Sequence, residues 1–276
     1  MVSALLITLR EGLEAALIIG IVLGYLGKIG DRRSALYAWG GAVIAAVFSA
    51  LLAIAMRLIG AELETPFEQL FEGTTMLLAV LVLTWMIFWM RYQARFMKKD
   101  LERRIDSAVN TGQNWGIFLL TFLAVIREGV ETALFLAANA FAADGASTLI
   151  GALLGLALAG AAGVLIYVYA VRLNLALFFD FTSLLLIVFS AGLLAHGVHE
   201  FQEIGLLPVL LNPAWDLRSI LSNDSLPGSV LRSLFGYNDN PSLLEVTTYL
   251  GYWIVILQAV RWWTQRLGAQ LVQKRA

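Results

Sequence analysis

A nine-residue pattern that occurs twice constrains this chain more than any other feature of its sequence. Residues 9–17 read Leu-Arg-Glu-Gly-Leu-Glu-Ala-Ala-Leu, and residues 126–134 read Ile-Arg-Glu-Gly-Val-Glu-Thr-Ala-Leu. Each copy places one arginine and two glutamates inside an apolar stretch that is long enough to cross a bilayer. Ionisable side chains at that depth are costly, and those that occur usually serve a site.

The composition around the two motifs is that of an integral membrane protein. Of the 276 residues, 59% are hydrophobic and 14% are charged, whereas soluble domains have roughly 45–50% apolar and about 25% charged residues. We therefore predict an all-α, polytopic membrane protein. Windows of about 20 apolar residues, the length that spans a bilayer, predict seven transmembrane helices, at residues 4–27, 35–60, 70–90, 115–139, 147–171, 181–199 and 244–263.

The distribution of basic residues predicts how the chain is oriented. If the seven helices alternate, the connections 28–34, 91–114 and 172–179 and the C-terminus lie on one side and carry 14 of the 19 lysines and arginines. Cytoplasmic connections are enriched in these residues. We therefore expect the N-terminus outside and the C-terminus in the cytoplasm.

A second similarity extends the repeat beyond the motif. Residues 71–78, Phe-Glu-Gly-Thr-Thr-Met-Leu-Leu, resemble residues 179–186, Phe-Asp-Phe-Thr-Ser-Leu-Leu-Leu. Three helices per copy is an odd number, so the second copy enters from the opposite side, as in the inverted repeats of secondary transporters. We expect a single transmembrane domain over 1–276, with repeat one at 1–92, repeat two at 115–203, an outer loop at 204–243 and an unpaired seventh helix at 244–265.

The two motifs are expected to meet near the middle of the membrane. A rise of about 1.5 Å per residue places Glu14 level with Glu128 and Glu11 level with Glu131. Arg10 and Arg127 can keep these carboxylates ionised, and the four glutamates still leave a formal charge of −2. With no cysteine in the chain, oxygen ligands favour a hard cation. In the structural alternative, the two motifs are internal salt bridges that brace their helices.

Further polar residues lie toward the two ends of the predicted helices. Imidazole and carboxylate groups at the outer end of the sixth helix, together with Glu72, suggest a site that collects metal ions, although a polar helix end in water is the simpler interpretation. Asp180 corresponds to Glu72 in the repeat and is a candidate inner exit, or a helix cap. Glu245 is interpreted as a solvated helix start. The candidate outer residues are Glu72, His196, His199, Glu200 and Glu203.

The paired motifs, together with His199-Glu200-Phe201-Gln202-Glu203, resemble the oxidase-dependent, high-affinity iron permeases of fungi and bacteria, the Ftr-type transporters. The resemblance covers essentially the whole chain. It implies that Glu11, Glu14, Glu128 and Glu131 bind iron during passage and that Arg10 and Arg127 support them. It also implies a location in the bacterial inner membrane and a separate periplasmic iron-binding protein or oxidase as the donor.

We therefore expect an iron importer and not an enzyme, with the iron ion, the bilayer and the donor as partners, no resident cofactor and no nucleic acid. Two alternatives remain open at this point. One is a permease for another cation, such as lead or manganese. The other is a membrane di-iron carboxylate oxidase, although such sites usually add Glu-x-x-His on partner helices, and this chain has no histidine near the predicted midplane.

Overall fold

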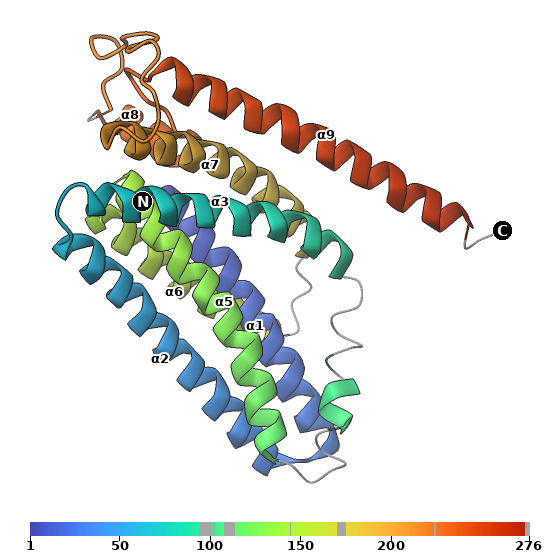
Figure 1. Ribbon diagram of the computed structural model, residues 1–276. Coiled ribbons are helices and arrows are strands. Elements are labelled where there is room, and N and C mark those ends of the chain that lie inside the picture. Colours follow the sequence, from blue (N-terminus) through green and yellow to red (C-terminus); the bar gives the residue numbers. More distant parts are fainter. Residues whose placement is uncertain are drawn as a thin grey trace.

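The computed structural model describes residues 1–93, 101, 103–107, 114–143, 145–169, 175–223 and 225–273, with side chains left out at 89–93, 166–169, 175–180, 226 and 263–273. Within these residues the chain is helical and contains no strand, as the composition predicts. The main helices are labelled in Figure 1. Their bounds are α1 Val2–Ile29, α2 Arg32–Glu62, α3 Phe67–Gln93, α5 Asn114–Ala142, α6 Gly145–Tyr169, α7 Leu175–Glu203, α8 Leu226–Phe235 and α9 Leu243–Gln273.

Five of the long helices are apolar and long enough to cross a membrane: α2, α3, α6, α7 and α9. The other two, α1 and α5, have 28 and 29 residues and carry the charged motifs. At about 1.5 Å per residue, each of the seven exceeds the roughly 30 Å of a hydrocarbon core. The segments expected from the sequence lie within these helices, except that residues 170 and 171 of the expected segment 147–171 lie outside the described residues.

Local sequence signals explain where several helices begin and end. Gly30 has a φ of 77° and ends α1 in the left-handed conformation that glycine adopts without strain. Asp31 then caps α2 by accepting hydrogen bonds from the backbone N and the Oγ of Ser34, at 3.0 and 2.6 Å. These hydrogen bonds lower the pKa of the Asp31 carboxyl below its ordinary value. Ser225 and Gly236 cap α8 in the same manner.

The helices associate in three close pairs, in which α2 packs along α5, α1 along α6 and α3 along α7. The two motif helices, α1 and α5, also contact each other. In Figure 1 the pair α3–α7 lies across one end of the group formed by α1, α2, α5 and α6, and α9 lies beside α7 on the outside. This arrangement brings the two repeated motifs face to face.

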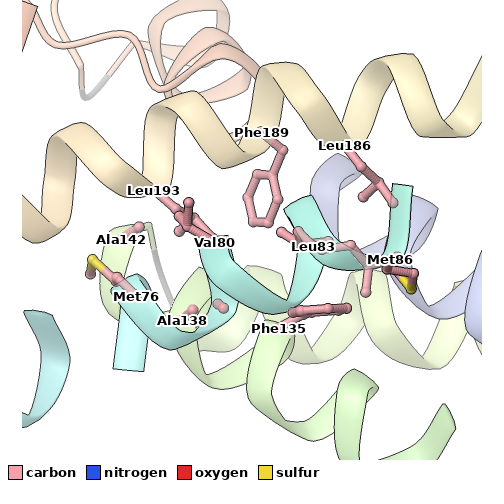
Figure 2. Packing of buried hydrophobic residues seen from close by; sticks show 12 residues of the cluster. Met76, Val80, Leu83, Met86, Phe135, Ala138, Ala142, Leu186, Phe189 and Leu193 are labelled. Atoms are coloured by element: carbon pink, nitrogen blue, oxygen red, sulfur yellow. The ribbon is translucent and has the colours of Figure 1, made fainter. Parts of the chain in front are cut away.

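The largest apolar cluster fills the space between the pair α3–α7 and the motif helices. Figure 2 shows side chains from α3, α5 and α7 that interdigitate there, with Phe135 beneath Leu83. Ile7 of α1 joins the cluster, and Ile7 and Phe135 are 1% and 0% exposed. A second cluster joins α1, α2 and α5 to Leu101 and Ile105 at the opposite end of α1.

Candidate metal-transport site

The charged residues of the first motif are all buried. Arg10 is 0% exposed, and its Nη1 donates a hydrogen bond to Oε1 of Glu11 at 2.6 Å. Its Nη2 lies 3.2 Å from Oε1 of Glu14, an ion pair whose geometry is not that of a hydrogen bond. Nη1 also contacts the sulfur of Met86 on α3 at 3.2 Å. One guanidinium therefore holds both glutamates of its own motif and reaches a neighbouring helix.

The second motif has the same residues but a different environment. Nε of Arg127 donates a hydrogen bond to Oε1 of Glu131 at 3.0 Å and lies 3.9 Å from Oε1 of Glu128. The Arg127 side chain is 37% exposed, whereas the side chains of Glu128 and Glu131 are 6% and 13% exposed. The two arginines therefore differ in their access to the surroundings, although the motifs match residue by residue.

Three carboxylates from the two motifs converge on one point. Ligand oxygens of Glu11, Glu128 and Glu131 all lie within 4.8 Å of one another, and Glu14 is not part of this group. The sequence estimate paired Glu11 with Glu131 and Glu14 with Glu128. The structure brings Glu128 to the first pair and leaves Glu14 beside Arg10.

Each of the four glutamates has one buried oxygen that accepts no hydrogen bond. These atoms are Oε2 of Glu11, Glu128 and Glu131 and Oε1 of Glu14. A buried polar atom without a partner is costly, and such atoms are few in native proteins. Three carboxylates with unused oxygens supply the oxygen ligands that hard and borderline metal cations prefer. The group is therefore suited to an ion that replaces the missing hydrogen bonds.

Close helix packing brings the two motifs together. A Cβ atom placed on Gly12 would lie 2.7 Å from Cβ of Ala159 on α6, and one placed on Gly129 would lie 2.5 Å from Cβ of Ser49 on α2. Both distances are too short for a side chain. The glycine inside each motif therefore allows its helix to approach a neighbour, so that the glutamates on either side of the glycine can face the partner motif.

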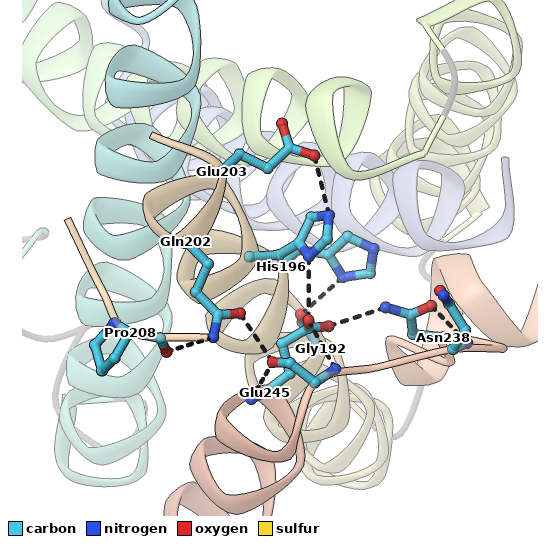
Figure 3. Close-up of polar contacts among 10 residues, drawn as sticks. Gly192, His196, Gln202, Glu203, Pro208, Asn238 and Glu245 are labelled. Carbon is cyan, nitrogen blue, oxygen red and sulfur yellow. Dashed lines mark hydrogen bonds and ion pairs between the residues drawn. The ribbon is translucent and has the colours of Figure 1, made fainter. Parts of the chain in front are cut away.

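The residues predicted as an outer collecting site have another arrangement. Glu245 accepts hydrogen bonds from Asn238 (Figure 3), from a His199 ring nitrogen and from the backbone N of Ser242. The other His199 nitrogen lies 3.3 Å from Oε1 of Glu203. His199 therefore bridges two carboxylates and ties the end of α7 to the start of α9.

The other outer candidates do not join this bridge. Nδ1 of His196 is hydrogen-bonded to the carbonyl oxygen of Gly192, 3.1 Å away. Glu200 lies where α7 packs against the start of α3. A Cβ atom placed on Gly73, the residue after Glu72, would lie 3.2 Å from Cβ of Glu200. Among the described side chains, the outer residues form no compact group of three ligands comparable to that of the motifs. Asp180 belongs to α7 and lies among the side chains that the structure leaves out.

Sequence reasoning missed two residues of these networks. Glu245 is 4% exposed, so its interpretation as a solvated helix start is wrong. A glutamate in the first turn of a helix gives no signal of burial, because such residues are common in water. Met86 gives no signal either, since methionines at helical spacing are usually core residues.

Comparison with known proteins identifies relatives along nearly the whole chain. The profile of the iron permease FTR1 family matches residues 1–268. The ferrous iron permease EfeU of Escherichia coli O6:K15:H31 (strain 536 / UPEC) is 40% identical over 257 residues, which cover 92% of this chain and 93% of that protein. The ferrous iron permease EfeU of Yersinia pestis is 40% identical over 255 residues, with 91% and 90% covered.

No solved structure matches the chain. The family match spans far more than half of the sequence and includes both motifs. Such coverage, with two relatives at 40% identity, decides the assignment. The chain belongs to the iron permease FTR1 family, and it is a membrane permease and not an enzyme.

Proposed function

We propose that this permease imports ferrous iron through the buried glutamate group of its two motifs. The observation that carries the proposal is the convergence of Glu11, Glu128 and Glu131, whose oxygens lie within 4.8 Å of one another and keep unbonded atoms. The names of the relatives, which are called ferrous iron permeases, support iron as the ion. Glu14, next to Arg10 and outside the trio, is the fourth member of the proposed path.

The charge of the group supports a divalent ion. Four carboxylates and two guanidinium groups sum to −2 when all are ionised. One divalent cation neutralises this charge, whereas a trivalent cation leaves +1 in an environment where an uncompensated charge is expensive. Fe²⁺ is a borderline ion that accepts carboxylate oxygens. In this proposal Arg10 and Arg127 offset part of the negative charge of the carboxylates while the site is empty.

We also propose that seven helices span the membrane as two inverted triplets, α1–α3 and α5–α7, followed by α9. Contacts at equivalent positions support this architecture. A Cβ atom on Gly41 of α2 would meet the carbonyl oxygen of Phe118 on α5, and one on Gly151 of α6 would meet the carbonyl oxygen of Met1 on α1. The two glycines are 110 residues apart in the sequence, and their partners Met1 and Phe118 are 117 apart. The two motifs are also 117 residues apart.

The route of the ion follows from the orientation that the basic residues favour. α1 contacts α8, and the N-terminus lies toward the α8 end of the molecule in Figure 1, which supports an N-terminus on the same side as the 204–243 loop. The acids Glu72, Glu200 and Glu203 then lie at the entrance, and Asp180 lies toward the cytoplasmic exit. In the proposal, a periplasmic iron-binding protein or oxidase delivers the iron to these outer acids, and the inner membrane of a bacterium is the location.

The test is uptake of ⁵⁵Fe²⁺ by proteoliposomes that contain the purified protein. We expect Glu11→Gln and Glu128→Gln each to lower uptake by about tenfold or more, because each removes a charged ligand while preserving its shape. Glu64→Gln is the matched control, since Glu64 is an exposed acid in the turn between α2 and α3. Uptake at the parent rate in both motif variants, with unchanged protein levels, would refute the proposed site.

Competition by unlabelled metals tests the choice of ion. We expect excess Fe²⁺ to suppress ⁵⁵Fe uptake at lower concentration than Mn²⁺ or Pb²⁺. If Mn²⁺ or Pb²⁺ competes more strongly than Fe²⁺, the site belongs to another cation. The glutamate variants distinguish a different transported ion from a wrongly placed site. If the site is correctly placed, they should lose transport of whichever ion it carries.

A further inference from the structure

The contact between Arg10 and Met86 joins the proposed ion site to a helix outside the two motifs. Met86 lies on α3, is 1% exposed and belongs to the apolar cluster of Figure 2. Its sulfur lies 3.2 Å from Nη1 of Arg10, the same nitrogen that donates to Glu11 at 2.6 Å. A thioether sulfur is a weak hydrogen-bond acceptor. The Met86 sulfur is therefore an acceptor that α3 offers to the guanidinium.

From this geometry we propose that Met86 is a positioning residue for the ion site, whose sulfur holds the Arg10 guanidinium against Glu11 and Glu14. The proposal rests on the function proposed above. A guanidinium has five N–H donors in a fixed plane, so its position is set by the acceptors around it. Met86 and the two carboxylates together hold the Arg10 guanidinium at its own motif. Glu128 and Glu131 then keep oxygens that the ion can meet.

The second repeat has a different side chain at the position equivalent to Met86. The offset of 108 between the similar segments of α3 and α7 aligns Met86 with Leu194, which has no heteroatom in its side chain. Leu194 also packs against the apolar cluster, as a partly buried residue. The two repeats thus present equivalent apolar side chains, but only one of them offers sulfur. The repeat with the sulfur is also the one whose arginine, Arg10, is fully buried. Arg127 in the other repeat is 37% exposed.

Three variants separate the acceptor from packing. Met86→Leu nearly keeps the volume and removes the sulfur, a swap that protein cores usually tolerate. Met86→Gln restores an acceptor, the amide oxygen, on a side chain of similar length. Met76→Leu is the matched control, because Met76 is also on α3, is 0% exposed and belongs to the same cluster. No polar contact of Met76 is seen among the described residues.

The measurement is the concentration dependence of ⁵⁵Fe²⁺ uptake in proteoliposomes, with thermal unfolding recorded for each variant. We expect Met86→Leu to raise KM by about tenfold, the size typical of lost support for a metal ligand. Met86→Gln should restore most of the affinity, and Met76→Leu should leave KM unchanged. Equal KM values for the two leucine variants, or no recovery with glutamine, would overturn the role of the sulfur.

The outcome is distinguishable from a failure of the proposed site itself. If Glu11→Gln and Glu128→Gln abolish uptake while Met86→Leu behaves like Met76→Leu, the site stands and Met86 is only a core residue. If the glutamate variants transport iron at the parent rate, the site is wrong, and the role of Met86 is overturned with it. Metal selectivity provides a second readout, since a displaced Arg10 should also weaken discrimination between Fe²⁺ and Mn²⁺.

Discussion

At the scale of single residues, the two arginines of the motifs have diverged in what surrounds them. Arg10 is enclosed by Glu11, Glu14 and Met86, whereas Arg127 contacts Glu131 and Glu128 and is partly exposed. The planar fork of arginine can serve two carboxylates together, but the ammonium of lysine is a point charge. Replacement by lysine should therefore affect the two positions differently.

We predict that Arg10→Lys lowers stability and uptake more than Arg127→Lys does. In the buried position, lysine leaves at least one carboxylate without its partner, at a cost of about 1–3 kcal/mol for each unsatisfied buried group. At position 127 the ammonium retains access to the surroundings and can still pair with Glu131. Thermal unfolding in detergent and ⁵⁵Fe²⁺ uptake measure the two effects. Equal losses in the two variants would contradict the asymmetry of the arginines.

The sequence predicted the central residues of the site but not their neighbours. The doubled motif is evident in the sequence, because charge in an apolar segment is a strong and local signal. Helix geometry predicted the approach of Glu11 to Glu131, which the structure shows. The roles of Met86 and Glu245 depend on which helix packs against which, and no local pattern encodes that. Glu14 was expected in the ligand group, but its contact with Arg10 could not be ranked against the alternatives without side-chain positions.

At the scale of helices, small residues determine how closely the elements approach. Gly41 of α2 and Gly151 and Gly155 of α6 lie where a neighbouring helix leaves no room for a Cβ atom. A Cβ atom on Gly155 of α6 would lie 2.9 Å from the backbone N of Leu9 on α1, one residue before Arg10. One placed on Gly160 of the same helix would meet nothing within 4 Å. One face of α6, which includes Gly155, therefore makes the close contact with α1.

We predict that Gly155→Val lowers the stability of the protein, by about 1–3 kcal/mol or more as is typical of overpacking, and also lowers iron uptake. The added methyl groups push α1 away from α6 and displace the first motif. Gly160→Val adds the same groups and changes the helix propensity by the same amount. Because it meets no neighbour, it should unfold at the parent temperature. Thermal unfolding of the two variants measures the difference. Similar melting temperatures would show that the α1–α6 contact tolerates a larger side chain.

At the scale of the whole molecule, the absence of cysteine makes the topology directly testable. We predict that a cysteine introduced at Asp216, in the outer loop, reacts with a membrane-impermeant maleimide on intact spheroplasts. A cysteine introduced at Lys28, at the end of α1, should react only after permeabilisation. Both native residues are exposed, so the label can reach either position when its side of the membrane is accessible.

The same pair of positions also tests the number of membrane crossings. Between residues 28 and 216 lie α2, α3, α5, α6 and α7, and five crossings is an odd number. Labelling of both positions from one side would therefore contradict the seven-span arrangement. Labelling of position 28 alone from outside would keep the number of crossings and reverse the orientation.

The apolar cluster between the outer acids and the ion site has an electrical consequence. Along α3, Glu72 and Met86 are 14 residues, about 21 Å, apart, and the cluster residues between them are almost fully buried. A layer without water carries most of the voltage drop across the membrane. Under the proposed orientation and route, an inside-negative potential acts on the ion chiefly while it crosses this layer, with about 2.3 kcal/mol per elementary charge for each 100 mV. Because Fe²⁺ carries two charges, dissipating the potential with valinomycin and potassium should slow uptake steeply.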